Sequence, residues 1–137
     1  MSHSPATRGP ALRARPLSPH LTIYRWPITM TMSIMHRITG GALYVGAVLV
    51  VWWLVAAATS ESQFGLIDWL VRSWFGKLVL FGYTWAMFHH MLGGLRHLIW
   101  DTGAGMDKAG ASKLAWATIV GSVLLTLLVW AVYMAIA

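Results

Sequence analysis

Three long stretches without a charged residue constrain the fold of this chain more than any other feature of its sequence. They cover residues 38–60, 78–95 and 114–137. A helix needs about 20 residues to cross the hydrocarbon layer, and the middle stretch reaches that length by continuing through Arg96 towards Trp100. With 58% hydrophobic and 10% charged residues, the chain is too apolar for a water-soluble domain. The sequence predicts an all-α membrane protein with three transmembrane helices, at about residues 29–58, 75–100 and 113–137.

Outside these spans the sequence offers little further structure. We expect residues 16–137 to form a single membrane-anchor domain and residues 1–15 to form a mobile tail, in which prolines discourage a helix. No apolar segment and cleavage site follow the first arginines directly, so the start does not resemble a secretory signal. An arginine-rich start without acidic residues also fits an organelle transit peptide, but its shortness and its lack of helical amphipathicity disfavour that alternative.

The charged residues indicate topology rather than a charged ligand. The net charge of +6 is not gathered in one patch, which argues against nucleic acid, and the absence of cysteine excludes thiolate metal sites in this chain. Arginines 8, 13, 15, 25 and 37 precede or begin the first span, and Arg96, Lys108 and Lys113 flank the second connection. The positive-inside rule therefore places the N-terminus in the cytoplasm and the C-terminus on the other side. We expect a bacterial inner membrane, with the mitochondrial inner membrane as the alternative.

The end of the second predicted span carries ionisable side chains. Such groups are costly at membrane depth and usually have a function. His90, Gly94 and His97 are spaced by four and three residues, so a helix places them on one face. An imidazole above a glycine gap suits a flat, iron-containing cofactor. His89 is a competing candidate, but its side chain points about 100° away from that of His90.

The first predicted span carries a second polar and small stripe. Its members follow a spacing of three and four residues: Ser33, His36, Arg37, Gly40, Gly41 and Tyr44. Because the second span runs in the opposite direction, Arg96 and His97 return to the level of this stripe, where cations can hold haem propionates. Simpler interpretations stay open: the glycines as helix contacts, the arginines as interface anchors, and the histidines as proton relays of a non-redox protein.

Three motifs together resemble a known family. Residues 15–24 read RPLSPHLTIY, residues 33–40 read SIMHRITG, and residues 90–101 read HMLGGLRHLIWD. They resemble, in order and spacing, the opening signature and the first-helix and second-helix motifs of the large cytochrome b anchor subunits of succinate dehydrogenase. The resemblance covers about residues 15–137. A fumarate reductase anchor or another quinone-linked cytochrome b is the alternative.

The resemblance implies partners and residue functions that spacing alone does not. In this family the subunit and a second small membrane-anchor subunit complete one helical bundle, which attaches a flavoprotein and an iron–sulfur protein to the membrane. Electrons from succinate pass through these proteins to ubiquinone. Ser33 and Arg37 match quinone-binding residues, and His90 matches the axial ligand of a haem b whose second ligand comes from the other anchor subunit. His36, Arg37 and His97 match the basic groups near the haem propionates.

Overall fold

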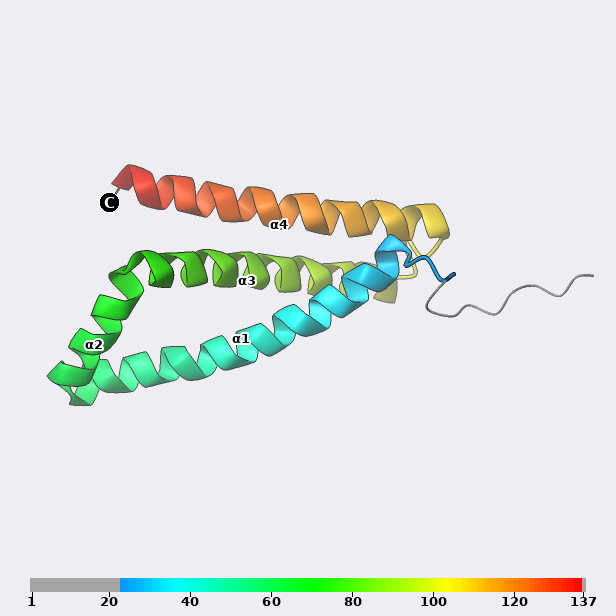
Figure 1. Cartoon of the computed structure of the whole chain (residues 1–137). Coiled ribbons are helices and arrows are strands. Elements are labelled where there is room, and N and C mark those ends of the chain that lie inside the picture. Colours follow the sequence, from blue (N-terminus) through cyan, green and yellow to red (C-terminus); the bar gives the residue numbers. More distant parts are fainter. Residues whose placement is uncertain (1–22, 137) are drawn as a thin grey trace, which may run out of the picture.

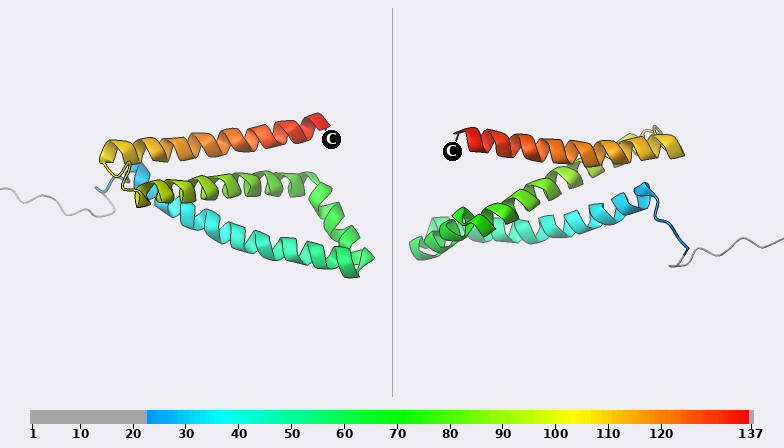
Figure 2. Two further views of the ribbon diagram at one scale, coloured as in Figure 1. Left: turned by 180° about the vertical axis from the view of Figure 1, so that it is seen from behind. Right: turned by 45° about the horizontal axis from the view of Figure 1, so that its top comes forward.

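The protein consists, over the residues that its computed structural model describes (23–136), of four α-helices. They are α1 (Ile28–Thr59), α2 (Glu61–Arg72), α3 (Trp74–Asp101) and α4 (Lys108–Ile136). The three long helices run side by side, and α2 connects α1 to α3 at one end of the bundle (Figure 1). Helix α3 lies between α1 and α4 and contacts all three other helices (Figure 2). The predicted tail, residues 1–15, lies outside the described residues.

The long helices occupy the ranges in which the sequence predicted membrane spans. By length and composition, α1 and α4 are apolar enough to cross a membrane. Helix α3 has 28 residues and therefore a length of about 42 Å, but its three histidines and its charged Lys77, Arg96 and Asp101 make it less apolar. The all-α prediction is confirmed, and two of the three predicted spans have the length and apolarity of transmembrane helices.

Helix α2 is an element that the sequence analysis did not anticipate, because the connection between the first two spans was expected only to carry charges. Serines delimit it. Ser60 Oγ accepts a hydrogen bond from Gln63 N at 3.4 Å, and Ser73 Oγ accepts one from Gly76 N at 3.0 Å at the start of α3. Such caps satisfy amide groups that a helix start leaves without partners. Gly76 is buried against the backbone of α2, so the corner between α2 and α3 is tight.

The packing surfaces of the long helices are small and polar, and the large apolar side chains face outwards. Apart from Gly76 at the corner with α2, the residues buried on α3 and α4 recur every three or four positions: Ala86, His89, Gly93 and Arg96 on α3, and Ala115, Thr118, Ser122 and Thr126 on α4. Lipid is as apolar as leucine, so helices in a membrane associate through close packing and hydrogen bonds instead of the hydrophobic effect. This inverted distribution is that of a membrane bundle.

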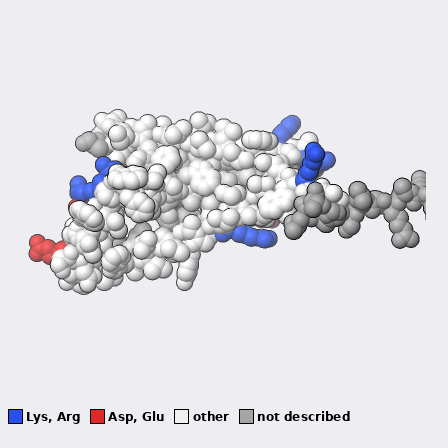
Figure 3. All heavy atoms as spheres, in the orientation of Figure 1, with Lys and Arg blue, Asp and Glu red and all other residues white. Residues whose placement is uncertain are grey.

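Charged side chains lie towards the two ends of the bundle and leave an uncharged band between them (Figure 3). The end where α1 begins and α3 ends carries Arg25, Arg37, Arg96, Lys108 and Lys113 against Asp101 and Asp107. The α2 end carries Arg72 and Lys77 against Glu61 and Asp68. The excess of positive charge is therefore confined to the first of these ends, which we call the basic end.

The contact between α1 and α3 near the α2 end provides a test of the packing. Tyr83 donates a hydrogen bond to the Leu43 carbonyl at 3.3 Å, and a Cβ atom added at Gly46 would overlap the Tyr83 ring. We expect Gly46→Ala to destabilise the detergent-purified protein by about 1–3 kcal/mol, as overpacking does. Gly82→Ala is the matched control, because a Cβ atom there meets nothing within 4 Å. Equal melting temperatures of the two variants, measured by circular dichroism, would contradict this packing.

Candidate haem and quinone site

Three of the predicted site residues meet between α1 and α3, towards the basic end. The imidazoles of His36 and His90 stack in parallel, with ring centroids 4.0 Å apart and planes inclined by 5°. The His97 ring lies 5.5 Å from that of His36. The structure thus brings together the histidines that the sequence assigned to one cofactor.

Glycines on the facing helix allow this stack. A Cβ atom on Gly93 of α3 would collide with Nδ1 of His36, and one on Gly40 of α1 would lie 2.9 Å from Cε1 of His90. Each helix therefore supplies one imidazole and one glycine to the contact. Gly94, which the sequence analysis placed next to a flat cofactor, does not take part in this contact. A Cβ atom on Gly94 would meet nothing within 4 Å, so the space beside it is open.

The hydrogen bonds of His90 fix its tautomer. Its Nδ1 lies 3.1 Å from the carbonyl oxygen of His36 and 3.5 Å from Oγ1 of Thr39. The Thr39 hydroxyl already donates to the Met35 and His36 carbonyls. A carbonyl oxygen only accepts, so Nδ1 of a neutral His90 carries the hydrogen and Nε2 keeps its lone pair. Within residues 23–136, that Nε2 has no hydrogen-bond partner. A backbone carbonyl on the second ring nitrogen is the usual support of a metal-binding histidine.

His89 points the other way, into the contact between α3 and α4. Its side chain is only 2% exposed, and Nδ1 lies 3.4 Å from Oγ of Ser122. The Ser122 hydroxyl donates to the Ile119 carbonyl, so it accepts from His89. The remaining nitrogen, Nε2, is buried without a partner in the described part of the chain. This histidine is therefore enclosed between two helices of its own chain, as the 100° offset from His90 implies.

The polar stripe predicted on α1 divides into two faces. His36 and Gly40 turn towards α3, whereas Ser33 and Arg37 are exposed. Tyr44, farther along the exposed face, is 76% exposed, so none of the described helices covers this side of α1. Ser33 and Arg37 lie one turn apart and can contact one ligand together. The structure keeps them on α1 beside the histidine stack, but not in it.

Arg96 is the residue whose placement differs most from the simple sequence interpretations. Instead of extending to the interface, its side chain is only 3% exposed. The guanidinium carbon lies 5.0 Å from the Trp100 ring centroid, and Nε and Nη1 have no hydrogen-bond partner in the structure described. The sequence did contain a signal for this burial. His89, Gly93 and Arg96 recur every three or four residues, as the small and polar residues buried on α4 do.

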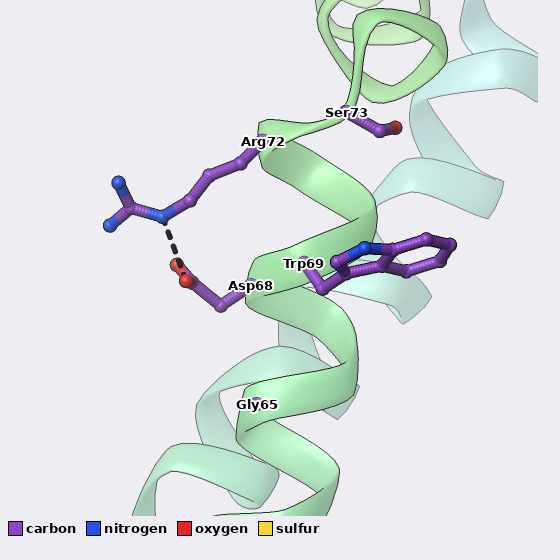
Figure 4. Close-up of a pocket in the computed structure, with 5 residues that line it drawn as sticks. All are labelled: Gly65, Asp68, Trp69, Arg72 and Ser73. Carbon is purple, nitrogen blue, oxygen red and sulfur yellow. Dashed lines mark hydrogen bonds and ion pairs between the residues drawn. The ribbon is translucent and has the colours of Figure 1, made fainter.

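A separate hollow lies on α2. It has a volume of about 380 Å³ and is lined by Gly65, Asp68, Trp69, Arg72 and Ser73 (Figure 4). Its charges already neutralise each other, because Nε of Arg72 donates to Asp68 at 2.7 Å. It is remote from the histidine stack, at the opposite end of the bundle.

Comparison with known proteins identifies the family to which the chain belongs. The family described as "Succinate dehydrogenase/Fumarate reductase transmembrane subunit" matches residues 11–129. The chain is 52% identical over 119 residues to the succinate dehydrogenase cytochrome b556 subunit of Paracoccus denitrificans, covering 87% of this chain and 92% of that one. It is 40% identical over 116 residues to the cytochrome b556 subunit of Rickettsia conorii, covering 85% and 90%. It is also 42% identical over 97 residues to the mitochondrial cytochrome b560 subunit of Sus scrofa, covering 67% and 56%.

The chain therefore belongs to the family of succinate dehydrogenase and fumarate reductase transmembrane subunits. Within that family it is a cytochrome b membrane-anchor subunit of succinate dehydrogenase, as the sequence motifs indicated.

Proposed function

We propose that this subunit holds one side of a haem b through His90 and forms part of a ubiquinone site with Ser33 and Arg37. The observation that carries the proposal is the hydrogen bond between Nδ1 of His90 and the His36 carbonyl, 3.1 Å long. It leaves the Nε2 lone pair available, in the plane of the ring. The stacked His36 ring covers a face of His90 and not the edge on which Nε2 lies.

The residues present fit a haem that is shared with another subunit. Within residues 23–136, no three His, Cys, Asp or Glu side chains gather as ligands of a bare metal ion would. A porphyrin supplies four of the iron's ligands, so it needs only one from this chain. The open space at Gly94, one turn from His90, suits the flat ring. The second small membrane-anchor subunit would supply the other protein ligand of the iron.

Two further basic residues, Arg37 and His97, lie next to the histidine stack, towards the basic end. His97 lies 5.5 Å from His36, and Arg37 is the next residue on α1. In this proposal His36, Arg37 and His97 hold the haem propionates, whose negative charges favour that end of the membrane. When bound, the haem supplies one-electron redox chemistry, with a potential that depends on axial ligation, burial and nearby charge.

The exposed face of α1 supplies the quinone contacts. Ser33 and Arg37 lie one turn apart near the basic end, where a docked iron–sulfur protein can deliver electrons. Ser33 donates a hydrogen bond to a quinone carbonyl, and Arg37 places positive charge beside the oxygen that gains electrons. Such preorganised donors stabilise negative charge as it develops. Reduction to the quinol takes two electrons from the iron–sulfur protein and two protons from water at this end.

The membrane arrangement follows from the same charges. The helices α1, α3 and α4 each cross the bilayer, with the basic end in the cytoplasm and the flavoprotein and iron–sulfur protein docked there. Helix α3 crosses despite its histidines, because His90 faces α1 and the cofactor and His89 faces α4. The membrane is a bacterial inner membrane, which the bacterial relatives support.

The haem assignment predicts different results for two adjacent histidines. His90→Leu removes the ligand, so the reduced spectrum of the purified complex loses its low-spin haem b bands. His89→Leu breaks only the contact with Ser122 and keeps them. The opposite pattern, with the bands lost in His89→Leu and kept in His90→Leu, would show that our assignment of the ligand is wrong.

The quinone assignment predicts that Ser33→Ala and Arg37→Leu each reduce succinate–quinone turnover by about tenfold to a hundredfold. Succinate oxidation by a soluble artificial acceptor is expected to stay normal, because the flavoprotein is untouched. The matched control is Arg72→Leu at the α2 end, which removes an exposed arginine with little effect on either assay. Normal quinone turnover by both variants in fully assembled complexes would exclude these residues from the site.

The topology is tested by reporter fusions at the two ends of the chain. Three spans place the two ends of the chain on opposite sides of the membrane, and the basic end lies in the cytoplasm. We therefore expect a reporter at residue 1 to be cytoplasmic and one after residue 137 to be periplasmic. If both reporters were active on the same side, α3 would not cross the membrane as proposed.

A further inference from the structure

The guanidinium of Arg96 is a buried cation that the haem and quinone proposals do not use. It is 97% buried, and two of its nitrogens have no hydrogen-bond partner within the described chain. The Trp100 ring, 5.0 Å away, offsets only part of the lost hydration. A buried charge normally has a paired anion, so its environment is incomplete without one.

Arg96 borders a groove of about 100 Å³ between α3 and α4. The other lining residues are almost entirely aliphatic: Leu92, Leu95, Ile99, Leu114, Ala117 and Thr118. The Thr118 hydroxyl is already committed to the Leu114 carbonyl, so Arg96 is the only free hydrogen-bond donor among these side chains. A groove with one cation at an otherwise apolar wall matches a molecule that has one anionic group and a hydrocarbon chain.

The groove is separate from the histidine stack. It opens on the α4 side of α3, where His89 also points, whereas His90 and His97 turn to the α1 side. Its position along the bundle is the basic end, since Arg96 lies five residues before the end of α3. Lys113 is exposed one helical turn before Ala117 and adds a second positive charge beside the groove.

We propose that this groove binds an anionic phospholipid of the cytoplasmic leaflet. Its phosphate pairs with the Arg96 guanidinium, and one acyl chain follows the apolar wall between α3 and α4. Charge complementarity favours an anionic over a zwitterionic headgroup, because a choline group would bring a third cation beside Arg96 and Lys113. The inference goes beyond the haem and quinone proposals and depends on neither of them, and only its choice of leaflet rests on the proposed topology.

The test uses the intact complex, purified in detergent and stripped of lipid. Phosphatidylglycerol, phosphatidylcholine or inorganic phosphate is added back, and bound lipid is counted by mass spectrometry during titration. We expect phosphatidylglycerol to bind the unmodified complex more tightly than phosphatidylcholine, whose phosphate is accompanied by a cation. We expect Arg96→Gln to weaken phosphatidylglycerol binding about tenfold, the value of one charge-assisted hydrogen bond. Lys108→Gln is the control, since it removes an exposed cation at the same end that does not line the groove.

A second variant separates the loss of the site from the loss of the fold. Ala117→Trp fills the groove and keeps Arg96, and we expect it to lose phosphatidylglycerol binding in the same way. Unchanged binding by Ala117→Trp would overturn the proposal. So would inorganic phosphate displacing phosphatidylglycerol at equal affinity, which would indicate a free anion, or an Arg96→Gln variant that shifts the haem spectrum but binds phosphatidylglycerol normally. The haem bands of His90→Leu report on the other proposal independently.

Discussion

The contact between His36 and His90 fixes how α1 and α3 lie against each other. Each imidazole packs on a glycine of the opposite helix, Gly93 or Gly40, and any larger residue at either position would separate the rings. The same approach brings the His36 carbonyl within 3.1 Å of Nδ1 of His90. This hydrogen bond sets both the ring orientation and the tautomer of His90. The lone pair on Nε2, which we propose binds iron, therefore stays free because of backbone packing and not because of a separate charged partner.

The second contact surface of α3 complements the first. His89 and Arg96 turn into the contact with α4, where Ser122 accepts a hydrogen bond from the imidazole. Because adjacent positions of a helix point about 100° apart, fixing His89 on α4 also directs His90 towards α1. Helix α3 thus carries polar groups on two sides and buries His89 and Arg96 among the helices, which explains how a helix less apolar than α1 and α4 can lie in the same bundle.

Much of this arrangement was predictable from sequence because membrane helices follow simple length and spacing rules. The three uncharged stretches predicted the long helices, and the spacing of His90 and His97 predicted their common face. Helix spacing alone did not predict which members of the stripe on α1 contact α3: His36 and Gly40 do, whereas Ser33 and Arg37 are exposed. The burial of Arg96 was also not evident, since an arginine near a span end usually extends to the interface. Helix α2 was missed because charges in the connection were considered without the serines that cap it.

The most direct test of this account is an experimental structure of the assembled complex with its haem, at a resolution that shows the side chains around the iron. The account predicts iron bound to Nε2 of His90, with Nδ1 of that ring on the His36 carbonyl, His89 on Ser122, and the second axial histidine from the other anchor subunit. Iron bound to His89, or a His90 ring turned away from the His36 carbonyl, would contradict it.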